Sequence, residues 1–338
     1  MIKDKEERCA VYYTFLISGT LQYFMNRVVS LFSGVGGIDM AFENAGFKTV
    51  FANDIDTYAC KTFDENFELK STCKDVREID AKDLPDFDCL IAGFPCQAFS
   101  IAGYRKGFED TRGTLFFEIA RILKERKPNV ILLENVKNLV SHDSGKTFDV
   151  ILSTLKEIGY HVRYKVLNAC EYGNIPQNRE RIYIVGFLNE EFANKFYFPD
   201  PIPLTTSLKD LIDFEEKVEE KYYYTEEKYP KIVKAMESFT SEDTLYQWRR
   251  QYIRQNKSNM SPTLTANMGT GGHNVPLVRT KFGIRKLTPK ECFNIQGFPE
   301  SFKLPRVSTA QLYKQAGNSV CVGVIQRIAE NIYKIINN

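Results

Sequence analysis

The sequence predicts an α/β protein with a doubly wound, mostly parallel sheet and a smaller inserted domain. Short apolar runs rich in β-branched residues alternate with helix-like segments over residues 27–187, and this alternation is typical of parallel sheets with helices on both faces. The runs are almost continuously apolar, as expected of strands that are buried on both sides. From residue 189 the alternation stops, so a second unit of different architecture is expected there.

The apolar runs that end in small or polar residues are the predicted strands, at residues 27–34, 48–54, 87–96, 129–136 and 181–187. Helices are predicted between them, at residues 37–46, 113–127 and 148–159, because apolar residues recur there at spacings of three and four. The tail at residues 317–336 returns to a helical period.

Changes in composition divide the chain into an extension, two domains, a hinge and a final helix. Residues 1–26 form the extension, with Met25 as an alternative start because a predicted strand follows it directly. Residues 27–205 form the larger domain, residues 206–288 the inserted domain and residues 289–317 the hinge. Residues 318–338 form a helix that is expected to return to the larger domain.

The overall composition is that of an ordinary soluble protein. Hydrophobic residues make up 43% of the 338 positions and charged residues 26%, with a formal net charge of +2, which argues neither for nor against nucleic acid. The eight cysteines form no C-x-x-C pair and there are three histidines, so neither a metal site nor a disulfide framework is expected. The apolar stretch at residues 11–24 is too short to span a bilayer. A reducing, cytoplasmic location is expected.

A glycine-rich turn joins the first predicted strand to its helix. Gly34, Gly36 and Gly37 would let a ligand approach the backbone and meet amide donors at the helix start. About twenty residues on, Asp54 closes the next strand, where a carboxylate can accept a pair of ribose hydroxyls. The pattern indicates a nucleoside-bearing cofactor, either a dinucleotide or S-adenosylmethionine; a tight turn with no ligand is the alternative.

Cys96 stands where a predicted strand has just stopped, which is where open α/β sheets place their chemistry. A free cysteine is more often a small buried hydrophobe. Here Pro95 stiffens the approach, and a reactive thiol requires partial exposure and positive potential nearby. The loop that follows supplies both features, with Gly103, Gly107, Arg105 and Lys106.

Glu134 ends the neighbouring predicted strand, so its carboxylate and Cys96 are expected in one crevice. Burial beside a thiolate would raise its proton affinity and suit an acid role; a surface carboxylate is the alternative. Arg179 and Arg181 alternate before the last predicted strand and are expected on one face. There they could hold an anion or a substrate carbonyl, or be ordinary exposed arginines.

Together these residues resemble the DNA (cytosine-5)-methyltransferase family of bacterial restriction–modification systems. The resemblance rests on motifs in the family's order, namely FSGVGG, GFPCQAFS, ENV, QNRERIYIVGF, RKLTPKECFNIQGFP and QAGNSV. They span residues 32–320. The resemblance implies a Rossmann-like, S-adenosylmethionine-dependent methyltransferase fold in which residues 206–288 recognise the target.

The family's mechanism, carried onto this chain, implies a role for each catalytic candidate. The target cytosine would be flipped out of the duplex. Cys96 would add to ring carbon 6, Glu134 would hold ring nitrogen 3 and the exocyclic amine, and Arg181 would contact the ring carbonyl with Arg179 nearby. Carbon 5 would then become nucleophilic towards the methyl group of S-adenosylmethionine.

The resemblance also implies a set of cofactor-binding positions. Many relatives place tryptophan where this chain has Ile55, and a glutamate where it has Asp54. Apolar packing is therefore expected on one adenine face in place of aromatic stacking. The full set of implied positions is Phe32, Gly34, Gly36, Gly37, Asp54, Ile55, Asp75, Val76, Pro95, Asn318 and Ser319.

Double-stranded DNA is the partner that the resemblance implies, and the inserted domain would read it. A loop at residues 100–110 is expected to close over the DNA, and the basic segment at residues 249–257 holds no acid. The predicted DNA-binding residues are Ser100, Arg105, Arg249, Arg250, Arg254, Lys257 and Thr263. A monomer is expected, paired in function with a cognate restriction endonuclease.

Three other functions compete with DNA methylation. A tRNA methyltransferase on the same scaffold is disfavoured by the Pro-Cys-Gln signature and the sizeable inserted domain. An inactive DNA-binding regulator would have no reason to retain Cys96, Glu134, Arg179 and Arg181 together. A nicotinamide oxidoreductase would leave the thiol and the carboxylate without a role. The recognised base sequence does not follow from the residues.

Overall fold

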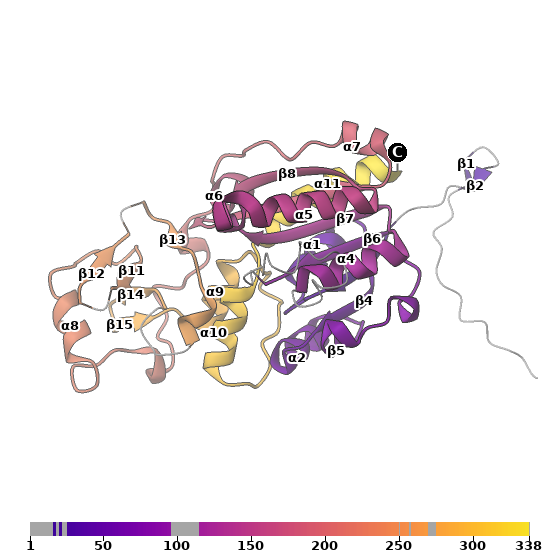
Figure 1. Cartoon of the computed structure of the whole chain (residues 1–338). Coiled ribbons are helices and arrows are strands. Elements are labelled where there is room, and N and C mark those ends of the chain that lie inside the picture. Colours follow the sequence, from indigo (N-terminus) through magenta and orange to yellow (C-terminus); the bar gives the residue numbers. More distant parts are fainter. Residues whose placement is uncertain are drawn as a thin grey trace, which may run out of the picture.

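The chain forms a large lobe built on a central sheet and a smaller lobe at one end of it (Figure 1). The computed structural model describes residues 16–17, 20–21, 26–95, 115–249, 251–256, 258–269 and 275–337. The predicted α/β fold with a mostly parallel sheet is confirmed. The proposed boundaries between the domains stay a prediction.

The sheet of the large lobe has the strand order β5-β4-β3-β6-β7-β10-β8. From β5 to β7 neighbouring strands are parallel, whereas β10 runs antiparallel to both β7 and β8. The antiparallel step arises because the chain first forms β8 at the edge and then turns back between β7 and β8. The strands are β3 (Arg27–Leu31), β4 (Lys48–Asp54), β5 (Thr72–Cys73), β6 (Cys89–Gly93), β7 (Val130–Val136), β8 (His161–Asn168) and β10 (Glu180–Phe187).

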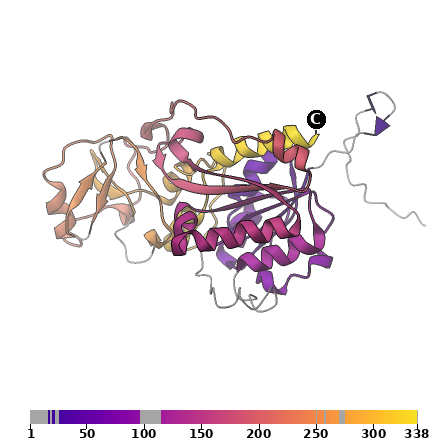
Figure 2. The same cartoon turned by 45° about the horizontal axis from the view of Figure 1, so that its top comes forward.

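Alternate residues of the strands enter two separate apolar cores, one on each face of the sheet. On β3, for example, Val28 belongs to one core and Val29 to the other. Helices α1 (Gly37–Asn44) and α11 (Val322–Asn337) cover the first face, and α4 (Leu115–Arg126) and α5 (Lys146–Ile158) cover the second (Figure 2). This burial on both sides is the physical reason for the continuous apolar runs in the sequence.

The small lobe is built on an antiparallel sheet of order β12-β11-β14-β15. Helix α8 (Pro230–Met236) packs on it around a small core that includes Met236, Tyr246 and Leu277. The strands are β11 (Tyr246–Trp248), β12 (Ile253–Gln255), β14 (Leu277–Thr280) and β15 (Gly283–Lys286). A separate parallel pair, β9 (Gln177–Asn178) with β13 (Ser261–Pro262), links the two lobes.

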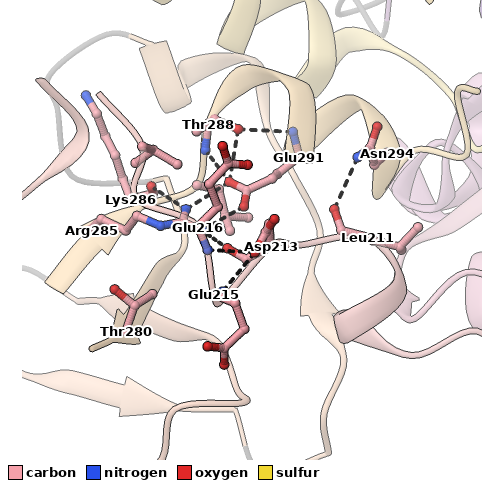
Figure 3. A network of polar contacts seen from close by, with 12 residues as sticks. Leu211, Asp213, Glu215, Glu216, Thr280, Arg285, Lys286, Thr288, Glu291 and Asn294 are labelled. Carbon is pink, nitrogen blue, oxygen red and sulfur yellow. Dashed lines mark hydrogen bonds and ion pairs between the residues drawn. The ribbon is translucent and has the colours of Figure 1, made fainter. Parts of the chain in front are cut away.

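A buried ion pair fixes the small lobe to helix α9 (Pro289–Asn294), as Figure 3 shows. The fully buried Arg285 donates to both carboxylate oxygens of Glu291, at 2.8 and 2.9 Å, and to the Asp213 carbonyl at 2.6 Å. Glu291 also accepts from the Thr288 backbone N–H at 2.7 Å, within a capping box that begins the helix. The entry and exit of the small lobe are therefore held together at one charged contact.

The remaining α-helices and strands are short or connect the lobes. They are β1 (Leu16–Ile17), β2 (Thr20–Leu21), α2 (Thr57–Asn66), α6 (Ala169–Tyr172), α7 (Glu190–Lys195) and α10 (Thr309–Asn318).

No helix of the described residues is long and apolar enough to cross a membrane.

Candidate active site and cofactor cavity

A cavity of about 680 Å³ opens at the carboxyl ends of β3, β4, β6 and β7. Parallel strands bring their carboxyl ends to one edge of a sheet, so residues far apart in the sequence meet there. The end of α10 and the start of β10 complete the wall. The predicted site residues that line it are Phe32, Gly34, Gly37, Asp54, Ile55, Asp75, Val76, Pro95, Glu134, Arg179, Arg181, Asn318 and Ser319.

Some predicted site residues are not placed at this cavity. Gly36 does not line it, because it faces the ring of Phe67. Cys96, Ser100, Arg105, Arg250 and Lys257 lie outside the described residues. Their predicted roles therefore stay predictions.

The turn after β3 holds three residues in the left-handed backbone region. Gly34 has φ +56° and faces open space, and Gly36 has φ +87° with no room for a side chain beside the Phe67 ring. Phe32 also has φ +54°, which is uncommon for a bulky residue. Strain of this kind persists where the surroundings impose it and is concentrated at functional sites.

Asp54 connects the end of β4 to this glycine turn. One carboxylate oxygen accepts from the Gly34 backbone N–H and the other from the Asp56 N–H, both at 2.8 Å. Burial raises the pKa of Asp54, although these backbone N–H groups favour its charged form. Asp54 lines the cavity and each of its oxygens can accept a further hydrogen bond, and the neighbouring Ile55 is 63% exposed.

Asp75 and the α10 end form two further parts of the cavity wall. The Arg77 guanidinium and backbone N–H bond to the Asp75 carboxylate, with Nε at 2.9 Å, and hold its pKa below the usual value. Ser319 follows α10, and its buried hydroxyl has no hydrogen-bond partner among the described residues. Both positions can therefore offer polar atoms to a ligand.

Glu134 lies near the carboxyl end of β7 and is a buried carboxyl that faces Arg181 across the strand pair. Arg181 Nε lies 3.0 Å from Glu134 Oε1, an ion pair in which Oε1 accepts no well-aligned hydrogen bond among the described residues. Burial raises the pKa of Glu134, and the positive charges of Arg181 and Arg179 oppose that rise. The two side chains lie together at the cavity.

Arg179 lies at the same cavity but its guanidinium is bonded within the protein. It donates to the carbonyls of Leu264, at 2.8 Å, Gly317, at 3.2 Å, and Ser319. Its exposed fraction is 3%, and burial beside Arg181 lowers its pKa to about 10. Both arginines line the cavity, as expected of residues on one face, but carbonyls from distant segments already bind the guanidinium of Arg179.

Several lining residues were missed by sequence reasoning. Asn135 donates from Nδ2 to the Phe94 carbonyl at 2.8 Å, so it holds the segment that leads to Cys96. Lys314 donates to the Asp56 carboxylate at 2.7 Å, and both residues line the cavity. Lys314 precedes Asn318 by four residues on α10, so helical spacing could have identified it.

The predicted DNA-binding residues that are described lie on the small lobe and its link to the sheet. Arg249 and Arg254 are exposed on the β11–β12 hairpin, opposite the buried Tyr246 and Ile253. Tyr252, at the tip of this hairpin, is 60% exposed and was not predicted.

Thr263 lies on the link between the lobes. Its hydroxyl donates to the Asn178 carbonyl at 2.6 Å. That bond attaches the segment after β13 to the large lobe, and the hydroxyl oxygen stays able to accept a hydrogen bond.

Known proteins resemble this chain over nearly its whole length. Residues 26–334 match the family described as C-5 cytosine-specific DNA methylase. Type II methyltransferase M.Bsp6I of Bacillus sp. (strain RFL6) is 60% identical over 312 residues, which cover 92% of this chain and 99% of that protein. Type II methyltransferase M.HhaI of Haemophilus parahaemolyticus is 43% identical over 324 residues, covering 92% and 95%.

Solved structures share the fold at lower identity. A mutant of DNMT2 from Spodoptera frugiperda superposes with a TM-score of 0.70 at 23% identity, covering 91% of this chain and 99% of that one. A structure described as a putative DNA modification methyltransferase encoded within a prophage of E. coli gives a TM-score of 0.66 at 21% identity, covering 93% and 100%. The family match and the identity to M.Bsp6I are decisive: this chain belongs to the C-5 cytosine-specific DNA methylase family and is a DNA (cytosine-5) methyltransferase.

Proposed function

We propose that this enzyme transfers a methyl group from S-adenosylmethionine to carbon 5 of a cytosine flipped out of a short, specific duplex sequence, through a covalent adduct with Cys96. The observation that carries the proposal is the buried Glu134–Arg181 pair in the same cavity as Asp54 and the glycine turn. A base-binding acid and a nucleoside-binding carboxylate thus line one space.

The residues present fit S-adenosylmethionine. Asp54 offers carboxylate lone pairs to the ribose hydroxyls, and Ile55 offers exposed apolar surface to the adenine. Asp75, kept ionised by Arg77, can accept from an exocyclic amine. The unpartnered Ser319 hydroxyl and the open space at Gly34 add a polar atom and room for close approach.

Cys96 begins the reaction in this proposal. Its thiolate adds to carbon 6 of the ring, so an S–C6 bond forms and the C5–C6 double-bond electrons become available at carbon 5. Glu134, whose pKa is raised by burial, donates to ring nitrogen 3 and accepts from the exocyclic amine. Arg181 donates to the ring carbonyl and stabilises the negative charge that develops there.

The second half of the reaction restores the aromatic ring. When bound, the cofactor supplies an electrophilic methyl group to carbon 5 and leaves as a neutral thioether. A base then removes the carbon-5 proton, and the electrons of that bond expel the Cys96 thiolate and re-form the double bond. Asn135, by holding the Phe94 carbonyl, fixes the strand end from which Cys96 follows.

We further propose that the enzyme works as a monomer in the cytoplasm and protects DNA from a cognate restriction endonuclease. The Type II methyltransferases M.Bsp6I and M.HhaI support the link to restriction. The exposed Arg249 and Arg254, with Arg250 and Lys257 beside them in the sequence, support DNA reading by the small lobe.

The proposal is tested by offering labelled S-adenosylmethionine with duplex DNA and, separately, with tRNA. Label is expected in duplex DNA, as 5-methylcytosine at one short sequence, which bisulfite sequencing of DNA from expressing cells would locate. Glu134→Gln keeps the side chain's size and should lower turnover by about 10²–10⁴-fold. Label in tRNA alone would establish the alternative activity, and label on another DNA base would refute the proposed chemistry.

A further inference from the structure

Four chain segments that are distant in sequence meet in a buried polar joint beside the cavity. They are β9 with the residue after it, the segment that follows β13, the turn after α9, and the end of α10. Within the joint, the fully buried Gln177 donates to the Ile295 carbonyl at 2.9 Å and to the Gln296 side-chain oxygen at 3.1 Å. Gln296 donates in turn to the Ala316 carbonyl at 2.7 Å.

Leu264 is held in this joint at both of its backbone polar groups. Its N–H donates to the Gln177 side-chain oxygen at 3.2 Å, and its carbonyl accepts from Arg179 Nη1 at 2.8 Å. Thr263, directly before it, is bonded to Asn178. The segment that carries the predicted DNA contact at Thr263 is therefore fastened to the large lobe by three side chains.

The other half of the Arg179 guanidinium holds the wall of the cofactor cavity. Nη2 donates to the carbonyls of Gly317 and Ser319, on either side of Asn318. Asn318 and Ser319 both line the cavity. A side chain on Gly317 would overlap the Thr265 backbone, so the end of α10 lies directly against the segment after β13.

We propose that Arg179 is a positioning residue that couples DNA binding at the segment after β13, which holds Thr263 and Leu264, to cofactor binding at the end of α10. The inference rests on the proposed function, because it assigns the segment after β13 to DNA and the end of α10 to S-adenosylmethionine. Arg179 donates to both segments through one planar group, so a displacement of either segment changes the hydrogen-bond geometry at the other. A lysine cannot reproduce this fork, because its single ammonium reaches fewer carbonyls at once.

The test is a binding cycle with S-adenosylhomocysteine and a duplex that contains the methylation site. In the wild type, the duplex should tighten S-adenosylhomocysteine binding by roughly 10-fold, within the usual range of coupling between sites. In Arg179→Lys the affinities for S-adenosylhomocysteine with and without the duplex should differ by about 2-fold or less. Calorimetry measures both affinities, and the kcat and the two KM values are recorded for each protein.

Arg126→Lys is the matched control. Arg126 also donates to three backbone carbonyls, those of Ala81, Leu84 and Pro85, and it does not line the cavity. Its replacement should weaken the fold locally and leave the coupling at the wild-type value. If Arg179→Lys also keeps wild-type coupling while only its melting temperature falls, the residue is merely structural and the proposal is wrong.

Failure of the inference and failure of the proposed function give different results. If S-adenosylhomocysteine does not bind the wild type at all, the assigned cofactor is wrong. If it binds with an affinity that the duplex does not change, the function stands and the coupling is refuted. Should Arg179→Lys not fold, Gln177→Met removes the acceptor of the Leu264 N–H and is put through the same cycle; wild-type coupling in that variant would also overturn the inference.

Discussion

Asp39 is a buried carboxyl that no proposed step uses, and its replacement by asparagine gives a sharp prediction. It lies on α1 with an exposed fraction of 0%, and neither oxygen accepts a well-aligned hydrogen bond among the described residues. Burial raises its pKa from 3.8 to about 7, although the Ser30 hydroxyl favours the ionised form. The folded enzyme therefore keeps a proton that the unfolded chain releases.

The size and sign of the effect follow from proton linkage. A pKa raised by about 3 units corresponds to about 4 kcal/mol. Below the unfolded pKa both states are protonated, and this group's contribution to stability is fully present. As the pH rises through the folded pKa that contribution is lost, so the free energy of unfolding falls by about 4 kcal/mol between about pH 4 and about pH 8.

Asp39→Asn should remove this dependence. Urea unfolding followed by circular dichroism, at several pH values, gives the free energy of unfolding of each protein. The difference between variant and wild type should shift in favour of the variant by about 4 kcal/mol across that window. Glu157→Gln, at an exposed carboxylate of α5, is the control and should give a constant difference. A constant difference for Asp39→Asn would refute the reasoning.

Three further substitutions test the glycine turn, the DNA surface and the buried Arg285–Glu291 ion pair. Gly36→Ala should destabilise the fold by about 2–5 kcal/mol, because alanine is strained at a positive φ and its methyl group would overlap the Phe67 ring. Thermal unfolding measures this loss. Arg254→Ala should weaken DNA binding and reduce the salt slope by about 1, read by titration at several salt concentrations. Glu291→Gln should cost about 3–5 kcal/mol because the buried Arg285 loses its partner, and Trp248, the chain's one tryptophan, reports that unfolding by fluorescence.

Each substitution has a matched control. Gly159→Ala shares a positive φ, +113°, but meets nothing within 4 Å, so it should cost clearly less than Gly36→Ala. Arg163→Ala, on the edge strand β8, should leave DNA binding unchanged. Glu220→Gln, at an exposed ion pair, should be close to neutral. Equal effects in any pair would contradict the structural cause given for it.

The sequence predicted the strands that carry the cavity because burial on both faces leaves a continuous apolar run. β8 was missed for the opposite reason. It is an edge strand with half of its side chains exposed, so it shows no apolar run; residues 161–166 alternate polar and apolar side chains instead. β5 has two residues and offers no pattern at all.

The site was predictable wherever a residue's position at a strand end decided its place. Glu134 reaches the cavity for this reason, but it meets Arg181 only because β10 runs antiparallel to β7, which brings the start of β10 to the carboxyl end of β7. The environment of Arg179 could not be predicted either, because its partners are carbonyls 85 to 140 residues away and any sequence provides carbonyls. Only the folded path of the chain shows that its guanidinium is already bonded.

The central claim is that a sulfur atom of this chain bonds to carbon 6 of the target cytosine. Duplex DNA carrying 5-fluorocytosine at the methylated position cannot lose the carbon-5 substituent as a proton, so the adduct should persist. With S-adenosylmethionine present, mass spectrometry of digested complexes should find the modified base on the peptide that contains Cys96, and Cys96→Ser should give no such peptide. A stable adduct on another residue, or methylation by Cys96→Ser at the wild-type rate, would contradict the account.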